Sequence, residues 1–244
     1  MADPGYGPYA VRDEIRAAQA ALWRHIAEPG TWWAGAQRVA IARAARDADG
    51  CGFCAERKQA LSPGAMRGEH AGDASLPANV IEVIHRVRTD PARLSRAWFD
   101  AVKANGLEAG PYVEIIGLVA MLSGVDWFAR SLGLELPLLP EPRPGAPSRY
   151  TPASARDHGA WVPLIAPEDA GGSEADLYPA GAIVPNIIRA LSLVPSEVRV
   201  LHQMAAAHYL DLDRLPDPTA HRALDRMQME LVAARVSALN QCFY

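Results

Sequence analysis

Cysteine is scarce in this sequence, with three residues among 244. Two of the three lie close together, as Cys51-Gly-Phe-Cys54. An odd number of cysteines in so long a chain is poor material for the disulfide framework of a secreted protein. In a cytosolic protein, a Cys-x-x-Cys pair is typical of thiol redox chemistry or of metal binding. We therefore expect a cytoplasmic protein.

The sequence also lacks an excess of positive charge. Its formal net charge is -4, and both signs are mixed along the chain. Nothing in it resembles a basic nucleic-acid-binding patch or a polybasic membrane anchor. The first nine residues contain no apolar run of signal-peptide length. We expect neither a nucleic-acid partner nor a membrane-bound protein.

Sequence motifs for several common chemistries are missing as well. There is no glycine-rich phosphate loop, no nucleophile elbow and no paired-histidine zinc motif. The seven histidines are scattered, and His70 and His85 belong to no motif. We expect most of the histidines to be surface or core residues, and we predict no cofactor and no metal.

Runs of β-branched residues alternating with polar ones are almost absent, whereas apolar residues recur at helical spacing. This pattern predicts an all-α protein with about seven to nine helices. The expected helices cover residues 11–27, 39–45, 55–61, 77–87, 91–104, 112–132, 185–191, 195–209 and 217–240. Asp-Pro pairs at 90–91 and 217–218 are expected to begin two of them, with the aspartate as the cap.

The segment 112–132 is apolar on nearly all sides, so a membrane span is an alternative to a buried helix. Glu114, Asp126 and Arg130 interrupt it, and the uninterrupted stretch is shorter than the ~20 residues that a span needs. We expect a helix buried in a helical core.

Prolines crowd the middle of the chain and divide it. Their density predicts no regular element from 137 to 180. We expect a first helical half at 1–136 with the Cys-x-x-Cys pair, a linker at 137–180, and a second half at 181–244. Residues 64–76, rich in glycine, alanine and charge, are expected to form a mobile loop.

The two expected halves echo each other. In each, an alanine-rich helix and a short break lead to a cysteine: residues 38–45 precede Cys51, and residues 230–237 precede Cys242. This is a weak internal repeat.

The chain ends in Glu230-Leu-Val-Ala-Ala-Arg-Val-Ser-Ala-Leu-Asn-Gln-Cys242-Phe-Tyr244. This pattern resembles the approach to the active site in the alkylhydroperoxidase and carboxymuconolactone decarboxylase-like superfamily. It is most similar to the alkylhydroperoxidase-related (seleno)protein branch, in which selenocysteine can take the second cysteine position. That position would be residue 245 here. Because UGA encodes selenocysteine, we expect the sequence to be truncated at a UGA codon after Tyr244.

The resemblance implies a duplicated alkylhydroperoxidase-like helical domain. Residues 51–134 resemble one complete tail of that domain, and residues 185–244 resemble the front of a second, incomplete copy. It also implies a thiol- or selenol-dependent peroxidase that reduces hydroperoxides, with a dithiol protein or small thiol as reductant. Proteins of this family usually assemble through apolar faces, which implies a homo-oligomer.

Four candidate catalytic residues follow: Cys51 and Cys54 as a redox pair, Cys242 as a resolving thiol, and Glu230 as its upstream proton carrier. The first motif departs from the family pattern. Where the family has a histidine this chain has Lys58, and where it has the upstream glutamate this chain has Val39. Lys58 would still favour a nearby thiolate.

Each candidate has a simpler interpretation. Cys51 and Cys54 would be buried and inert, or would bind metal, although zinc would need two more ligands. Glu230 would pair with Arg226 four residues earlier on a helix face. Two other functions stay open: an inactive helical protein kept for assembly or binding, and a carboxymuconolactone decarboxylase-like lyase.

Overall fold

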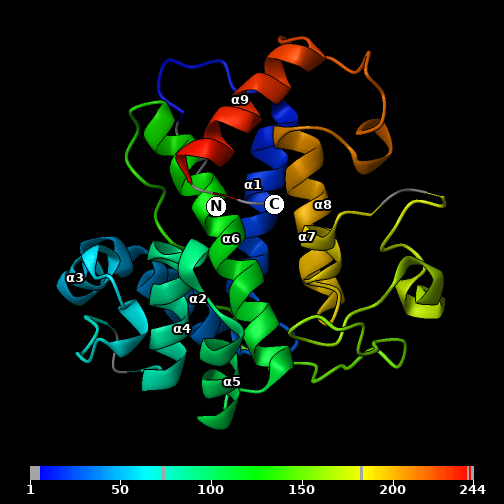
Figure 1. The fold of residues 1–244 in the computed structure, drawn as a ribbon. Helices are drawn as coiled ribbons and strands as arrows, with labels where there is room; N and C mark the ends of the chain where they lie inside the picture. Colours follow the sequence, from blue (N-terminus) through cyan, green and yellow to red (C-terminus); the bar gives the residue numbers. More distant parts are fainter. Residues whose placement is uncertain (1–5, 73–74, 182–183, 241, 243–244) are drawn as a thin grey trace.

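The computed structural model describes residues 6–72, 75–181, 184–240 and 242. Within these residues the chain forms nine α-helices and no extended β-strand (Figure 1), which confirms the predicted all-α class. The helices are α1 (Asp13–Ala27), α2 (Gly35–Asp47), α3 (Gly52–Gln59), α4 (Ala78–Thr89), α5 (Arg96–Ala104), α6 (Ala109–Ser131), α7 (Asn186–Arg189), α8 (Pro195–His208) and α9 (Arg226–Leu239).

Helix α6 lies in the middle of the bundle, between α1 and α8 on one side and α2 and α4 on the other (Figure 1). Within the described part of the chain it is the one helix long and apolar enough to cross a membrane. However, 67% of its most apolar stretch is buried inside the protein. This is how the core helix of a globular protein behaves, as the sequence predicted.

The two carboxylates that interrupt α6 are paired in the interior. Glu114 is fully buried against Arg38 of α2. Asp126 is fully buried against Arg46 of the same helix, which donates two hydrogen bonds to it at 2.8 and 3.2 Å. A buried carboxylate without a partner would strongly destabilise the fold, so these pairs fix how α2 lies against α6.

Helix α8 joins this buried network from the second half of the chain. Glu197 of α8 is fully buried, with one carboxylate oxygen 2.8 Å from His25 of α1 and 3.5 Å from Arg38. Gly117 of α6 faces it so closely that an added Cβ would lie 2.5 Å from the carboxylate. Residues far apart in the sequence thus share one charged interior.

The proline-rich segment 137–180 contains no α-helix, as predicted, but it packs on the core. Ile165 and Leu177 are fully buried, and the Ile165 N–H donates to the Ser192 hydroxyl at 2.7 Å. Side chains from all three expected parts of the chain belong to one continuous hydrophobic core. The packing shows no boundary between the two expected halves and the linker. Their division therefore stays a prediction from the sequence.

Both Asp-Pro helix starts were predicted wrongly. Asp90 binds the Arg93 side chain, with a shortest distance of 2.9 Å, and is followed by a single 3-10 turn. Helix α5 begins later, where the hydroxyl of Ser95 accepts from the N–H of Trp98. The carboxylate of Asp90 therefore has another partner and does not cap a helix.

The second wrongly predicted start is that of α9, which was expected to begin at the Asp-Pro pair 217–218. Asp217 accepts from the Thr219 N–H at 2.8 Å in a tight turn, and the helix starts only after Asp225. Asp225 and Gln228 form a reciprocal capping box there.

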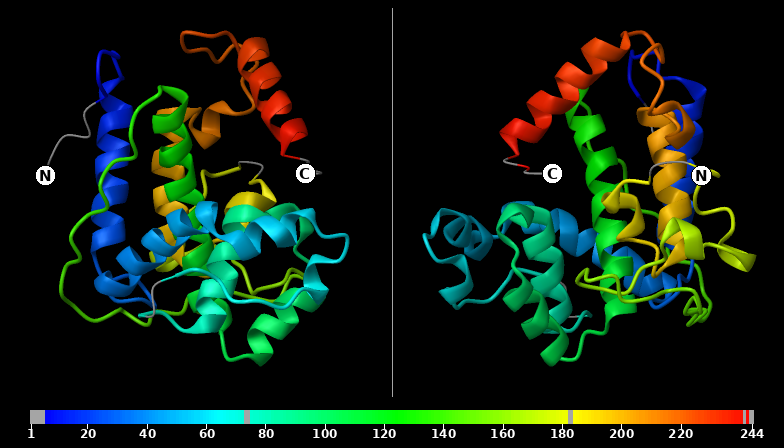
Figure 2. Two further views of the ribbon diagram at one scale, coloured as in Figure 1. Left: turned by 90° about the vertical axis from the view of Figure 1, so that its left-hand side faces the viewer. Right: turned by 45° about the vertical axis from the view of Figure 1, so that its right-hand side comes forward.

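Helix α9 lies at the edge of the molecule, apart from the bundle in both views of Figure 2. None of its residues is buried, and its exposed apolar side chains include Met227, Leu231 and Leu239, at 81%, 71% and 66% exposure. Its polar contacts with the rest of the chain include the hydrogen bond that the Tyr209 hydroxyl donates to Glu230.

Candidate active site around Cys51 and Cys54

The two neighbouring cysteines lie at the start of α3. A 3-10 turn at Ala48–Gly50 breaks the chain after α2, and Cys51 is the N-cap residue of the next helix. Cys54 follows in the first turn. Both thiols are free and buried, with only 3% and 4% of each residue exposed. A helix start is a favourable place for a thiolate because its unpaired N–H groups point at the sulfur.

The loop after α3 brings His70 to these thiols. Its Nδ1 atom lies 3.4 Å from Cys54 Sγ and 3.8 Å from Cys51 Sγ. Phe53 positions the loop, because its ring lies edge-on to the His70 ring at 5.1 Å between centroids. Gly68 passes so close to the Phe53 ring that an added Cβ would lie 2.5 Å from it. The segment expected to be a mobile loop therefore contributes a side chain to the site.

Helix α4 contributes the second histidine. His85 is fully buried, and its Nδ1 atom lies 3.3 Å from Cys54 Sγ. The rings of His70 and His85 are 4.3 Å apart between centroids. The Nε2 atom of His85 has no hydrogen-bond partner. The far side of the ring is therefore unpartnered, while Nδ1 faces the sulfur.

Glu82, one helical turn before His85, orients His70. Its carboxylate lies 2.6 Å from His70 Nε2. Arg57 of α3 holds the same carboxylate with two hydrogen bonds of 2.8 and 3.0 Å. Thiol, imidazole and carboxylate thus form one chain of contacts, which is the arrangement used to activate a nucleophile.

These contacts shift the pKa values of Cys51 and His70 in opposite directions. Burial alone would raise the pKa of Cys51, but N–H groups of Cys54 and Ala71 and the His70 ring lower it to about 7. Burial alone would lower the pKa of His70, but hydrogen bonds to Cys54, Glu82 and Cys51 raise it to about 10. Near neutral pH the pair favours a thiolate beside an imidazolium.

The other two titratable groups keep this charge pattern. Burial alone would raise the pKa of Glu82, but His70 and Arg57 lower it to about 2, so the carboxylate stays charged. Burial and the nearby charge of His70 lower the pKa of His85 to about 4, so this ring stays neutral. The raised pKa thus favours a charged His70 ring beside the thiols, and the lowered pKa favours a neutral His85 ring.

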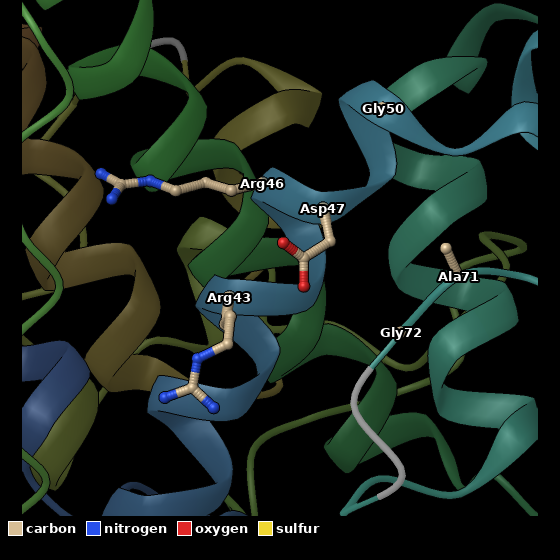
Figure 3. Close-up of a pocket in the computed structure, with 6 residues that line it drawn as sticks. All are labelled: Arg43, Arg46, Asp47, Gly50, Ala71 and Gly72. Carbon is tan, nitrogen blue, oxygen red and sulfur yellow. The ribbon is translucent and has the colours of Figure 1, made fainter.

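A surface pocket of about 610 Å³ adjoins this site (Figure 3). It is lined by Arg43, Arg46, Asp47, Gly50, Ala71 and Gly72. Gly50 precedes Cys51 in the chain, and the Ala71 N–H donates to the Cys51 sulfur. Arg46 extends away from the Ala71 side of the pocket, towards its partner Asp126. The pocket thus borders the chain neighbour of Cys51 and the N–H donor to its sulfur, although Cys51 itself is not among the lining residues.

The second motif lies in different surroundings. Glu230 is half-exposed, 2.8 Å from Arg226 in the expected helix-face pair, and it accepts from the Tyr209 hydroxyl. Cys242 is exposed. Phe243 and Tyr244 lie outside the described residues, so the expected completion of this motif stays a prediction. The structure brings Cys51 and Cys54 together, and it does not bring Cys242 into their cluster.

The residues at the two departures from the family pattern play no direct part at the first site. Lys58 is exposed on α3, and Val39 is buried in the core. His70 and Glu82 supply an imidazole and a carboxylate from other positions. Sequence reasoning missed them, and the signal that was present is Cys-x₂-Cys followed by two histidines with Glu82 three residues before the second.

The same four side chains could hold a metal ion. The ligand atoms of Cys51, Cys54, His70 and His85 all lie within 4.8 Å of one another. The two extra ligands that a zinc site requires are therefore present.

Comparison with models of protein families, with curated proteins and with solved structures finds no match for this chain.

Proposed function

We propose that Cys51 and Cys54 form a dithiol redox centre that reduces hydroperoxides. The observation that carries this proposal is the chain of contacts from the two thiols through His70 to Glu82, with distances of 3.4 Å and 2.6 Å. Such a chain supplies a nucleophile, a proton carrier and a group that orients it.

In the first step, the thiolate attacks the terminal oxygen of a hydroperoxide. The O–O bond breaks and an S–O bond forms, which leaves a sulfenic acid on the cysteine. The departing alkoxide takes a proton from the His70 imidazolium and leaves as an alcohol. Glu82 stabilises the imidazolium before the step and holds the ring in place throughout.

In the second step, the other thiol attacks the sulfenic sulfur. The S–S bond forms, the S–O bond breaks, and the hydroxyl leaves as water. His70, now neutral, accepts the thiol proton and passes it to the hydroxyl. An external dithiol then reduces the disulfide by thiol exchange and is itself oxidised to a disulfide.

Two features favour Cys51 as the attacking thiol. Its sulfur accepts N–H groups from Cys54 and Ala71, which stabilise a thiolate. The adjoining pocket is lined by Gly50 and Ala71, the chain neighbour of Cys51 and the N–H donor to its sulfur, so we expect a peroxide bound there to reach Cys51 before Cys54. The family resemblance assigns the attack to the second cysteine of the motif, so this assignment needs its own test.

The wider proposal follows the sequence resemblance: a cytoplasmic, homo-oligomeric peroxidase built from a duplicated alkylhydroperoxidase-like domain, with a dithiol protein or small thiol as reductant. The helical fold and the dithiol centre support it. Helices before both cysteine motifs, α2 and α9, are consistent with a repeat.

The test starts from reduced, metal-free protein treated with one equivalent of an organic hydroperoxide. We expect the peptide that spans Cys51 and Cys54 to lose two hydrogens, and we expect a dithiol to reverse the change. In a Cys54→Ser variant, a dimedone-type probe should label a sulfenic acid on Cys51. The Cys242→Ser variant is the matched control and should behave like the unmodified protein.

Two results would count against the proposal. Labelling of Cys54 in a Cys51→Ser variant, without labelling of Cys51 in the converse variant, would reverse the roles of the two thiols. If both thiols stay open to alkylation after peroxide, the redox function fails and an inactive helical protein becomes the better interpretation.

A further inference from the structure

We propose that Cys51, Cys54, His70 and His85 form a zinc site, and that zinc bound there holds the dithiol in a closed, protected state. The metal site stands on geometry alone, whereas the protected state rests on the redox function proposed above.

The distances between donor atoms match a tetrahedral zinc ion. Zinc binds sulfur at about 2.3 Å and imidazole nitrogen at about 2.0–2.1 Å, which places a sulfur and a nitrogen about 3.5 Å apart around a tetrahedron. Three of the four sulfur–nitrogen distances are 3.3, 3.4 and 3.8 Å, and all four donor atoms lie within 4.8 Å of one another. The donor atoms therefore lie close to the spacing that a tetrahedral ion requires.

The donor set selects the metal. Two thiolates and two imidazoles are a common combination for structural zinc, and hard ions such as magnesium and calcium prefer oxygen. The charges also balance, because two thiolates neutralise Zn²⁺ and the neighbouring Glu82 and Arg57 neutralise each other. A buried site with no net charge avoids most of the desolvation cost of an ion.

The surroundings of the histidines fit the same role. Metal-bound histidines usually donate their second N–H to a carboxylate, which fixes the ring. Glu82 is placed for this at 2.6 Å from His70 Nε2, and Arg57 fixes Glu82 in turn. His85 is fully buried and its Nε2 has no partner, whereas its Nδ1 points into the cluster. A metal at the centre would give this otherwise poorly satisfied ring a strong bond.

All four coordination positions would be filled by the protein, so zinc would have no open position for a substrate. A peroxide could then react with a thiolate only if the zinc site is lost. Two thiolates, one hydroperoxide and two protons from solvent give the Cys51–Cys54 disulfide, an alcohol and water, and Zn²⁺ is released. Metal binding and disulfide formation thus exclude each other.

The binding test uses the full chain in reduced form and zinc or cobalt alone as the probe. We expect one zinc per chain by mass spectrometry of the metal. Substituted Co²⁺ should show the strong visible bands of a tetrahedral site and a thiolate-to-cobalt charge-transfer band. The His85→Gln variant should weaken zinc binding by more than about 100-fold, and Glu82→Gln by about 10- to 100-fold, as loss of a carboxylate that holds a metal-bound histidine usually does.

Cys242→Ser and His221→Gln are matched controls outside the cluster and should bind zinc normally. X-ray absorption of the unmodified zinc protein should give two sulfur and two nitrogen neighbours, whether or not the His85 variant folds. Reduced, folded protein that takes up no zinc would overturn the proposal, and so would an oxygen-rich, octahedral cobalt spectrum.

The coupling test compares zinc-loaded and zinc-free protein after peroxide. We expect release of one zinc for each disulfide, with slower oxidation of the loaded form. Zinc binding without disulfide formation in the zinc-free protein would leave the metal site standing and remove the redox function. Disulfide formation in a protein that binds no zinc would leave the redox function standing and remove the metal site. Equal oxidation rates with and without zinc would overturn the protected state alone.

Discussion

Helix α2, which leads to Cys51, has eight buried residues and packs against α1, α4 and α6, whereas α9, which leads to Cys242, has none. The two stretches of sequence before these cysteines are alike. Their environments differ because a helix inside a bundle places its end against other elements, while a helix at the edge ends in solvent (Figure 2).

The difference shows where the chemistry of a cysteine motif comes from. The second motif has the expected glutamate in sequence, but Glu230 pairs with Arg226 and Tyr209 on the surface. The first motif lacks the expected histidine and glutamate in sequence, but the loop and α4 supply His70 and Glu82. Neighbours in space, rather than neighbours in the chain, give the first pair of thiols an imidazole and a carboxylate.

The largest expected difference between the two motifs lies in the cysteines themselves. Cys51→Ser should reduce hydroperoxide consumption by metal-free protein to the background rate, because no thiolate is left at the pocket. Cys242→Ser should leave the rate unchanged within about twofold, because surface substitutions seldom propagate. A coupled assay with an organic hydroperoxide and a dithiol measures both; equal losses would mean that the two motifs act together.

The proton carriers give the second comparison. His70→Gln should lower the rate of disulfide formation by about 10²- to 10⁴-fold, the usual contribution of general acid–base catalysis. Glu230→Gln should change it by less than about twofold, because its side chain is half-exposed and engaged elsewhere. Stopped-flow fluorescence on metal-free protein would measure the rates, with circular dichroism as the check on folding. A large effect of Glu230→Gln would return the catalytic role to the second motif.

Packing gives the third comparison. Ile84→Ala on α4, at a fully buried position, should lower the free energy of unfolding by about 2–5 kcal/mol. Leu231→Ala on α9, where the side chain is 71% exposed, should change it by less than about 0.5 kcal/mol. Urea unfolding followed by circular dichroism measures both. Comparable losses would show that α9 is covered in solution, for instance by a second copy of the chain.

The smallest expected effect concerns the buried ion pairs of Glu197, which join α8, unlike α9, to the core. Burial alone would raise the pKa of Glu197, but His25 and Arg38 lower it overall. Its pairing therefore stabilises the fold above the carboxyl's ordinary pKa of about 4.3 and is lost as the pH falls through the lower folded-state value.

Glu197→Gln should thus cost about 2 kcal/mol at pH 7, as for a lost hydrogen bond to a charged group, and progressively less in acid. Urea unfolding between neutral pH and pH 3 would show the two curves converging. A difference that grows in acid would contradict the assigned direction of the shift.

Most helices could be predicted from the sequence because their signal is local. The apolar repeat places α1, α2, α4, α6 and α8 close to their expected positions, and the most apolar stretch of α6 is largely buried, as expected of a core helix. The two Asp-Pro starts failed because Asp90 and Asp217 have nearby partners that compete for their carboxylates. Such competition is decided by where side chains lie, which spacing alone does not show.

The site could be predicted only in part. The Cys-x-x-Cys pair follows from the sequence, and so does a helix beside it, although the helix was expected at 55–61 and α3 begins earlier, at Gly52. His70 and His85 have no periodic relation to that pair, and His70 lies in a segment with no regular pattern at all. The order of two cysteines followed by two histidines was the one signal in the sequence, and it did not show that His70 and His85, of seven histidines, would meet the thiols.

By itself, then, the sequence determined an all-α chain, a central apolar helix and a pair of thiols at a helix start, because periodicity and turn residues act over a few neighbouring positions. Only the tertiary structure decided that these thiols meet two histidines and a carboxylate while Cys242 stays in solvent. That outcome depends on how α3, the following loop and α4 pack together. Packing joins residues 16 and 31 positions from Cys54, and no local rule in the chain specifies such contacts.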